Sequence, residues 1–514
     1  MRKVKILWAD DEIQMLKPHI LFLEEKGYEV VTTNSGDVAL DLIADDYFDL
    51  VFLDENMPGV SGLEALASIK KSHPHVPVVM ITKSEEEFIM EEAIGQKIAD
   101  YLIKPVHPHQ LLLTVKKNID EKKLVSAKTS SDYQREFRDI GMKLTQDLDD
   151  EEWKDIYKEI TYHELAIDKS EGSGMEEVLQ MQKTEANNEF FKFIANNYES
   201  WIQDDEGPLL SHNVMEERVF PLIEKGRPVF YILMDCLRYD QWKVIEKKVS
   251  ELYKVEEDIM FSILPTATQF CRNSIFSGLL PADIKKEHKD KWVDENEEEG
   301  KNLHEEFFLN ELIKRSSKDI SMSYHKVTNL ASGKKLESSV NNLFENDLNV
   351  VVYNFVDALS HARTDFKIVR ELADDSAAYR DITASWFEHS PLWEMMKKIA
   401  KKGGKIVINT DHGSVQVKKP LKVQGEKEVS TNLRYKQGRN LRYKSKEVFE
   451  INNPDDVGLP RLNVSSKYIF AGSTDFFAYP NNFNYYVKHY KNTFQHGGVS
   501  MEEMMVPLIV LDPK

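Results

Sequence analysis

The chain has 514 residues, of which 41% are hydrophobic and 30% are charged, and its formal net charge is −20. This composition is typical of a soluble globular protein with several domains, and the negative charge argues against a protein whose whole surface grips duplex DNA. No apolar run approaches the roughly 20 residues that a membrane helix needs, so we expect no membrane insertion.

The first 120 residues alternate apolar strands with helices. The chain opens with an apolar stretch that is too short for a signal peptide and ends in acids, so we expect a first strand and a cytoplasmic protein. Further strands are expected at 28–33, 48–54, 76–83 and 99–106, and helices at 13–26, at 36–44, in the acidic stretch before the last strand and from His109. This alternation predicts a doubly wound parallel sheet with helices on both faces.

Polar residues stand where these strands end, namely Asp10, Asp11, Asp54, Thr82 and Lys104. The carboxyl ends of parallel strands meet at one edge of a sheet, where ligands bind. Converging carboxylates need a cation, and Mg²⁺ binds one or two carboxylates together with phosphate oxygens. A threonine hydroxyl can bond a phosphoryl oxygen, and Lys104 can pair with its charge. Since Pro105 follows Lys104, their peptide bond is a candidate for the cis form.

The order of these five residues, with DENMPG beginning at Asp54, resembles the response-regulator receiver family. The resemblance implies a CheY-like fold and a Mg²⁺ site at Asp10, Asp11 and Asp54. It also implies that Asp54 takes a phosphoryl group from a sensor histidine kinase, and that Thr82 and Lys104 act as switch residues.

Residues 121–205 carry no strand pattern and predict three amphipathic helices, at 133–148, 149–168 and 173–203. Asp149 and Glu152 have the spacing of a capping box, and Ser173 is a candidate start for the third helix. Three such helices suggest a small bundle. The sequence leaves open whether this bundle is a spacer that also helps to form a dimer or a purely structural packing domain.

In the last 300 residues, three continuous apolar runs each end in an aspartate. The runs are 229–234, 348–356 and 405–410, and they are followed by Asp235, Asp357 and Asp411. Buried strands that deliver carboxylates to one sheet edge have the geometry of an active site on an α/β sheet. Each aspartate on its own is more often a turn or cap residue, but three of them beside histidines predict a site.

Histidines supply the other expected ligands. His361 follows Asp357 by four residues, His412 directly follows Asp411, and His496 precedes two glycines. Carboxylates and imidazoles are what zinc binds when thiolates are scarce, and the chain has only two cysteines, Cys236 and Cys271. We expect these two to be reduced, buried side chains.

A threonine hydroxyl is the candidate nucleophile. Thr268 precedes an expected helix at 269–277, and the free N–H groups of a helix N-terminus favour an incoming phosphate. A hydroxyl beside two cations can attack phosphorus. From these residues alone, Thr266 competes with Thr268 and both can be simple helix caps.

The order Asp, Thr, Asp-x3-His, Asp-His-Gly, His-Gly-Gly is similar to the alkaline phosphatase superfamily, which includes nucleotide pyrophosphatases and phosphodiesterases. The segment PTATQ at 265–269 resembles the P-T-x-T segment of the phosphodiesterase group, and this similarity favours Thr268. The resemblance implies one zinc at Asp235, Thr268, Asp411 and His412 and a second at Asp357, His361 and His496. Cys271 departs from the pattern, because the phosphodiesterases have a phosphate-holding Asn at that position. Arg272 and Asn273 are candidates to replace it.

The whole arrangement resembles the PorX-like family of PglZ-domain response regulators nearly end to end. The expected domains are a receiver at 1–120, a helical linker at 121–205 and a PglZ domain of the alkaline phosphatase superfamily at 206–514. The resemblance implies zinc-dependent hydrolysis of cyclic or linear oligonucleotides and homodimerisation on phosphorylation. It also implies association with a sigma factor and a role in type IX secretion.

A basic insert at 417–448 separates His412 from His496. It contains the pentad NLRYK twice, at 432–436 and 440–444. Arg beside Tyr offers phosphate pairing and a stacking face, as single-strand binders use, so we expect Arg434 and Arg442 to contact an oligonucleotide. A solvated basic hairpin is the alternative.

Two other functions remain open on this sequence. One is a phosphomonoesterase on the same metal scaffold. The other is a regulator that acts by protein binding and whose metal domain has little catalytic importance. No helix-turn-helix with a basic recognition helix is evident, so direct transcription-factor action ranks last.

Overall fold

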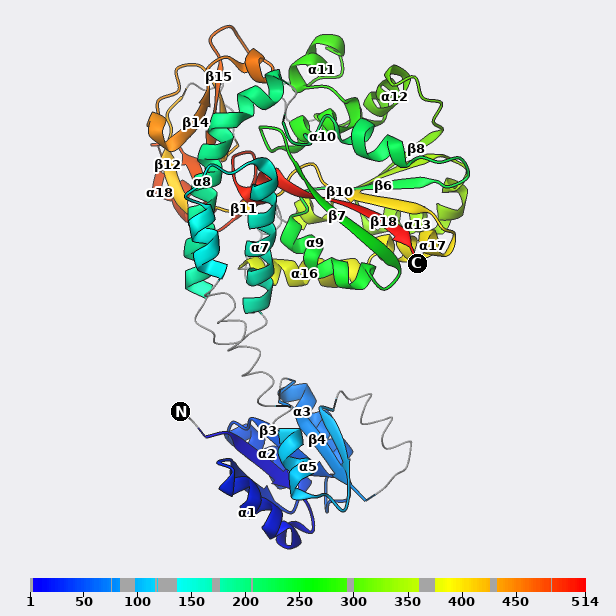
Figure 1. Cartoon of the computed structure of the whole chain (residues 1–514), viewed down its shortest axis with the longest axis vertical. Helices are drawn as coiled ribbons and strands as arrows, with labels where there is room; N and C mark the ends of the chain where they lie inside the picture. Colours follow the sequence, from blue (N-terminus) through cyan, green and yellow to red (C-terminus); the bar gives the residue numbers. More distant parts are fainter. Residues whose placement is uncertain are drawn as a thin grey trace. The chain divides into compact units, whose positions relative to one another are not determined.

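The computed structural model describes residues 3–74, 76–83, 98–115, 118, 136–168, 176–204, 207–293, 300–359, 375–425, 432–481 and 483–514. Contacts divide the chain into two compact units, one of residues 1–134 with 169–173 and the other of residues 135–168 with 174–514. Both are drawn in Figure 1. Within the described ranges, no helix is long and apolar enough to cross a membrane.

The first unit is the expected doubly wound sheet. Its strands are β1 (Lys5–Ala9), β2 (Glu29–Thr33), β3 (Leu50–Asp54), β4 (Val78–Thr82) and β5 (Asp100–Ile103), all parallel in the order β2-β1-β3-β4-β5. The helices are α1 (Lys17–Glu25), α2 (Gly36–Asp45), α3 (Gly62–Ser72) and α5 (Pro108–Val115). Alternate β1 residues enter two separate cores, Leu7 on one face and Trp8 on the other, as a sheet covered on both faces requires. The acidic helix expected before β5 lies outside the described residues.

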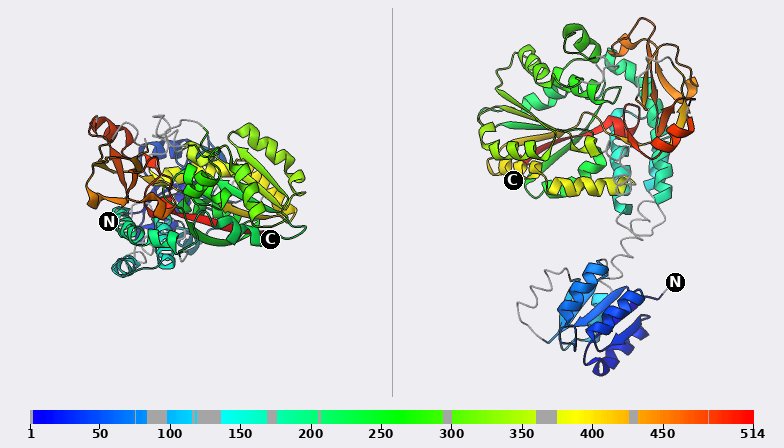
Figure 2. Two further views of the ribbon diagram at one scale, coloured as in Figure 1. Left: turned by 90° about the horizontal axis from the view of Figure 1, so that it is seen from above. Right: turned by 180° about the vertical axis from the view of Figure 1, so that it is seen from behind.

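The middle stretch is helical, as predicted. Residues 136–143 are helical, and α7 (Asp150–Asp168) and α8 (Glu176–Gln203) follow. The capping box before α7 is confirmed, because the Glu152 N–H donates to Asp149 Oδ1 (2.9 Å) and the Asp149 N–H donates to Glu152 (3.0 Å). Ser173 lies outside the described residues. Both helices belong to the second compact unit, and Figure 2 shows them side by side at its surface.

A six-stranded mixed sheet forms the centre of the second unit. The strands are β6 (Val229–Met234), β7 (Tyr253–Phe261), β8 (Met322–Val327), β9 (Leu348–Tyr353), β10 (Lys405–Asn409) and β18 (Met505–Pro513), in the order β7-β18-β10-β6-β9-β8. Strands β10, β6, β9 and β8 run parallel, whereas β18 pairs antiparallel with both β10 and β7. The surrounding helices are α9 (Tyr239–Val249), α10 (Thr268–Ser277), α11 (Pro281–Glu287), α12 (Glu305–Arg315), α13 (Leu330–Leu343), α16 (Ser376–Glu388) and α17 (Pro391–Lys401). The mixed α/β architecture expected here is confirmed.

The region between His412 and His496 is a folded subdomain. It comprises β11 (Val415–Gln416), β12 (Lys419–Lys422), β13 (Tyr435–Gly438), β14 (Val448–Ile451), β15 (Lys467–Ala471), β16 (Asp475–Ala478), α18 (Phe483–Tyr490) and β17 (Phe494–Gln495). The expectation that Arg434 contacts an oligonucleotide is wrong, because its side chain is 0% exposed and pairs with Glu503. The first NLRYK copy is therefore structural. Arg442, in the second copy, is exposed.

A buried ionic network fixes α7 to α9 and α16 within the second unit. Arg380 on α16 is 2% exposed, and its guanidinium donates to Glu164 (2.9 Å) and Asp240 (2.6 Å) and pairs with Asp168. Glu164 and Asp168 belong to α7, whereas Asp240 belongs to α9. A buried cation with several carboxylate partners is costly to remove, since each carboxylate then loses one of its cationic partners.

We predict that Arg380→Met destabilises this unit by about 2–3 kcal/mol, because Glu164 and Asp240 each lose one cationic partner and keep only Lys183 and Arg238. Urea unfolding followed by tryptophan fluorescence measures the loss. The matched control is Lys314→Met, which removes an exposed pair with Glu311 on α12 and should change stability by less than about 0.5 kcal/mol. Equal effects of the two substitutions would contradict the role given to Arg380.

Candidate active site

The first unit gathers its strand-end residues at one edge of the sheet. Asp10 follows β1, Asp54 ends β3 and Lys104 follows β5, and the lysine Nζ lies 2.7 Å from Asp10 and 3.0 Å from Asp54. Asp10, Asp11 and Asp54 each offer an oxygen within 4.8 Å of the others, which makes them a possible metal site. Thr82 ends β4 and is buried. The Lys104–Pro105 bond is cis, as expected.

Burial and pairing shape the charges of this edge. Burial raises the pKa of the Asp54 carboxyl, and the neighbouring Lys104 offsets only part of this effect. Burial lowers the pKa of Lys104, but its bonds to Asp10 and Asp54 outweigh burial and leave that pKa raised. Lys104 therefore stays charged beside Asp54, where it can pair with added negative charge. Magnesium fits the donor set, since all three candidate ligands are carboxylates.

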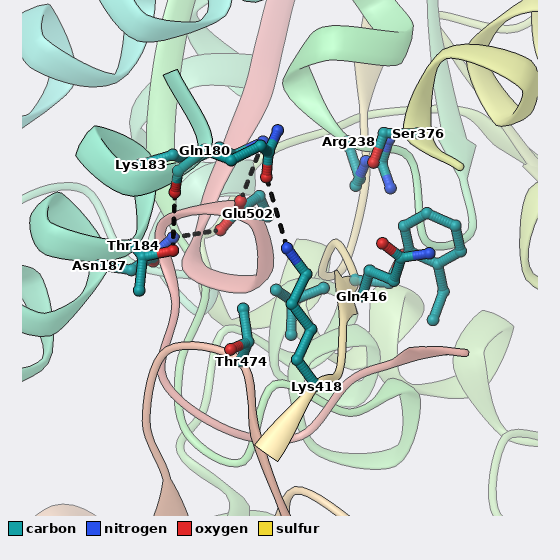
Figure 3. A pocket seen from close by; sticks show the side chains of 13 residues that line it. Gln180, Lys183, Thr184, Asn187, Arg238, Ser376, Gln416, Lys418, Thr474 and Glu502 are labelled. Atoms are coloured by element: carbon teal, nitrogen blue, oxygen red, sulfur yellow. Dashed lines mark hydrogen bonds and ion pairs between the residues drawn. The ribbon is translucent and has the colours of Figure 1, made fainter. Parts of the chain in front are cut away.

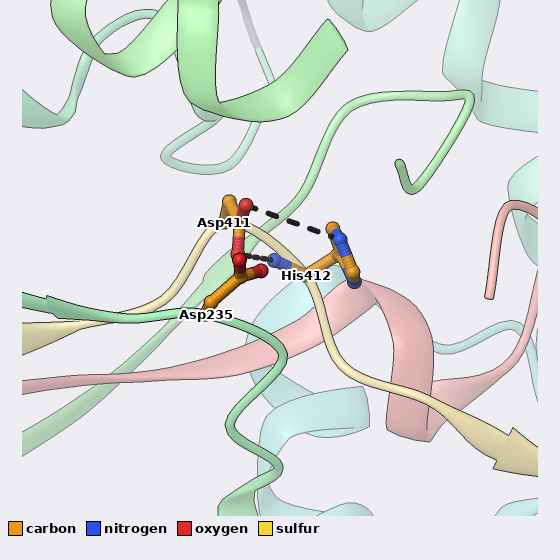
Figure 4. A group of neighbouring side chains, drawn as sticks. All are labelled: Asp235, Asp411 and His412. Atoms are coloured by element: carbon orange, nitrogen blue, oxygen red, sulfur yellow. Dashed lines mark hydrogen bonds and ion pairs between the residues drawn. The ribbon is translucent and has the colours of Figure 1, made fainter. Parts of the chain in front are cut away.

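Strand register explains why two distant aspartates meet in the second unit. The parallel pairing of β10 with β6 sets Asn409 opposite Leu233, so Asp411 and Asp235, two residues further on each strand, emerge side by side. The Cys236 N–H donates to Asp411 Oδ1 (3.3 Å) and ties the two strand ends together. Both aspartates are buried. With His412 they form a group whose ligand atoms lie within 4.8 Å of one another, a possible metal site (Figure 4).

Arg272 on α10 pairs with both aspartates. Its Nη2 lies 2.8 Å from Asp411 and also contacts Asp235, and its Nη1 lies 3.4 Å from Glu305. Burial raises the pKa of Asp411, but Arg272 and His412 outweigh burial and leave the pKa at about 2. The pKa of Asp235 is instead raised well above its usual range, by burial and by the nearby charges of Asp411 and Asp357, which Arg272 only partly offsets.

The candidate nucleophile faces the same group. Thr268 is the first residue of α10, and its Oγ1 lies 3.0 Å from His412 Nε2. His412 Nδ1 lies 3.0 Å from the Gly413 carbonyl, which fixes the ring. His496 stacks on His412 with ring centroids 4.1 Å apart, and its Nδ1 lies 3.0 Å from the Thr266 carbonyl. Thr266, the competing hydroxyl, donates instead to the Gly498 carbonyl (2.9 Å).

The remaining expected ligands are less closely placed. The expectation that an apolar strand runs to residue 356 is wrong, because β9 ends at Tyr353 and residues 355–359 turn into a helical segment. Phe355 there stacks on Trp386 at 4.0 Å, which stabilises the turn. Asp357 lies in this segment, outside the close group but near enough to raise the pKa of Asp235. His361 lies outside the described residues.

Glu305 is a site residue that the sequence does not predict. Arg272, expected as a candidate phosphate ligand, pairs with carboxylates in the structure. Glu305 is buried at the start of α12 and contacts Arg272, Tyr324 and Lys326. No motif surrounds it, so only the fold reveals it.

Cys271 is free and buried, as is Cys236, and this expectation is confirmed. Asn273 donates to the Lys301 carbonyl (3.2 Å).

The residues of this group suit a divalent cation. Asp235 Oδ1 is buried and, within the part of the chain that the structure describes, has no hydrogen-bond partner. A buried carboxylate oxygen without a hydrogen bond is costly unless it coordinates a cation. Two carboxylates and an imidazole beside a hydroxyl are ligands that zinc accepts.

Three family models match the chain in succession. They are the response regulator receiver domain at residues 6–116, the PorX response regulator linker domain at 123–202 and the BREX system PglZ alkaline phosphatase-like domain at 214–511.

Curated relatives match the receiver region. The alginate biosynthesis transcriptional regulatory protein AlgB of Pseudomonas putida is 37% identical over 120 residues, 23% of this chain and 27% of that protein. The transcriptional regulatory protein ResD of Bacillus subtilis is 31% identical over 114 residues, 22% of this chain and 47% of that protein. The chain thus spans less than half the length of either. A solved receiver domain from Clostridium thermocellum is 33% identical, with a TM-score of 0.23, and the match covers 24% of this chain and 98% of that one.

Fold, site and matches together define a response regulator with an alkaline phosphatase-like output domain. The chain belongs to the PglZ alkaline phosphatase-like domain family, whose model covers more than half of it. With the linker model between receiver and output domain, it is a PorX-like response regulator. A receiver domain implies a cognate histidine kinase.

We predict that Asp54→Ala abolishes phosphoryl labelling by acetyl phosphate or by the cognate kinase, because the variant lacks the carboxylate that Lys104 approaches. Labelling is measured by phosphate-affinity electrophoresis. The control is Asp41→Ala, an exposed carboxylate on α2, which should label like the wild type. Equal labelling of Asp54→Ala would show that the phosphoacceptor lies elsewhere.

Proposed function

We propose that the chain is a two-component response regulator whose output domain is a zinc-dependent phosphodiesterase acting on cyclic or linear oligonucleotides. Phosphorylation of Asp54 controls it, and its output regulates type IX secretion. The observation that carries the proposal is the Thr268 hydroxyl, which lies 3.0 Å from His412 beside the buried Asp235 and Asp411. A hydroxyl, an imidazole and two carboxylates in this arrangement suit nucleophilic attack on phosphorus.

Two ions are proposed for the output domain. Asp235, Thr268, Asp411 and His412 would hold one, and Asp357, His361 and His496 would hold the other. The close approach of three ligands of the first set supports that assignment, and the stacking of His496 on His412 supports neighbouring ions. When bound, zinc supplies Lewis acidity and lowers the pKa of a coordinated hydroxyl.

The chain's own residues direct the chemistry. Thr268 Oγ forms a bond to phosphorus as the bond from phosphorus to the leaving oxygen breaks, and water later cleaves the phosphothreonine. Thr268 is the first residue of α10, and the N–H groups of a helix N-terminus can hold phosphoryl oxygens. Arg272 and Asn273 are already engaged with carboxylates and a carbonyl. The α10 N-terminus therefore holds the phosphate, as an Asn at the position of Cys271 does in the phosphodiesterases.

The proposals on regulation and partners are based on the family to which the chain belongs. A PorX linker between receiver and PglZ domains supports homodimerisation on phosphorylation, a sigma factor partner and a role in type IX secretion. Gel filtration with light scattering, before and after acetyl phosphate treatment, tests dimerisation.

We predict that Thr268→Val retains zinc but loses turnover by more than about 1,000-fold, because the nucleophile is gone. Turnover is measured with bis-nitrophenyl phosphate and with short oligonucleotides, with and without chelator, and zinc by elemental analysis. Thr268→Ser, which keeps a hydroxyl, should retain much of the activity.

Unchanged turnover of Thr268→Val would remove this residue as nucleophile. Faster hydrolysis of nitrophenyl phosphate than of the diester would favour a phosphomonoesterase. A zinc-loaded protein that hydrolyses neither would favour regulation by protein binding.

A further inference from the structure

Glu503 connects two candidate ligand segments that are far apart in the sequence. It lies in α19 (Met501–Met504) and is 0% exposed. Its backbone carbonyl accepts the N–H of Gly413 (3.0 Å), the residue after His412. Its side-chain Oε1 accepts the N–H of Gly498 (2.9 Å), two residues after His496. One residue thus touches the chain beside both stacked histidines.

The Glu503 side chain is itself rigidly held. Arg434, also fully buried, pairs with it through two nitrogens, Nε to Oε1 at 3.0 Å and Nη2 to Oε2 at 2.5 Å, and the Ser500 hydroxyl donates to Oε2 (2.7 Å). Paired bonds of this kind fix both position and orientation. Space is equally restricted, since a Cβ on Gly413 would lie 1.9 Å from the Glu502 carbonyl. A shift of α19 would therefore shift the Gly413 segment.

Helix α8 holds the start of α19. Asn187 is 1% exposed, and its Oδ1 accepts the Met501 N–H (2.8 Å) while its Nδ2 donates to Glu502 (3.0 Å). Lys183, one turn earlier, lies 3.2 Å from Glu502. Figure 3 shows Asn187, Lys183 and Glu502 converging at the edge of a small pocket. Three consecutive residues, Met501 to Glu503, therefore connect a linker helix to both ligand segments.

We propose that Glu503 is a positioning residue for the metal ligands and that Asn187 on α8 sets its position, so that the place of α8 governs metal affinity and turnover. This inference rests on the proposed zinc site. Groups that orient metal ligands typically change affinity or activity by 10–100-fold when removed. The contacts give the linker a direct physical route to the site.

The test measures zinc affinity of the full chain by competition with a fluorescent chelator. Glu503→Gln should weaken affinity by about 10–100-fold, and Asn187→Ala by about fivefold, the equivalent of one net hydrogen bond. At saturating zinc both should lower kcat with KM nearly unchanged. The controls are Glu257→Gln, which removes a partly buried carboxylate bonded to Trp242, and Asn197→Ala, which removes an α8 amide bonded only to the Phe193 carbonyl among the described contacts.

Weaker zinc binding by Glu503→Gln and Asn187→Ala, with wild-type affinity in the two controls, would support the inference. If the wild type binds zinc and all four variants bind it equally, the inference is overturned while the proposed function stands. A wild type that binds no zinc would overturn both. Should Glu503→Gln fail to fold, as thermal unfolding would reveal, the comparison of Asn187→Ala with Asn197→Ala decides the matter.

Discussion

Charge compensation at the ends of β6 and β10 is the constraint on which the output domain depends. The parallel register brings Asp235 and Asp411 together in a buried place, where two carboxylates repel each other strongly. Arg272 relieves part of this repulsion and is itself balanced by Glu305. Burial and the charge of Asp411 raise the pKa of Asp235, and Arg272 offsets only part of this effect. A cation beside His412 would complete the balance, so the folded state and metal binding favour each other.

Much of this architecture follows from local sequence rules. Apolar runs ending in polar residues locate the strand ends of both sheets, because parallel strands buried on both faces leave few other places for charge. The same rule predicts that Asp235 and Asp411 meet at one sheet edge, and the parallel register of β6 and β10 brings them together. It failed at Asp357, where an apolar run continued past the last ladder residue into a helical turn stabilised by Phe355 and Trp386.

Other features were beyond the reach of sequence patterns. In the sequence, Arg434 is one of many basic residues of the insert. Its partner Glu503 is 69 residues away, and no motif links the two. Glu305 gave no signal at all. Long-range ion pairs depend on the final packing of several elements, whereas strand ends and caps such as Asp149–Glu152 depend on neighbouring residues. Strand ends and caps can therefore be predicted from one sequence, whereas long-range ion pairs cannot.

The place of β18 in the sheet has a consequence for synthesis. Residues 505–513 pair with β10 on one side and with all nine residues of β7 on the other. Strand β7 begins at Tyr253 and β18 begins at Met505. About 250 further residues must therefore be translated before β7 can pair with β18. Until then the edge of β7 that later pairs with β18 offers unpaired N–H and C=O groups to other chains. Nascent or truncated copies are thus the forms of this protein most exposed to aggregation and to chaperone capture.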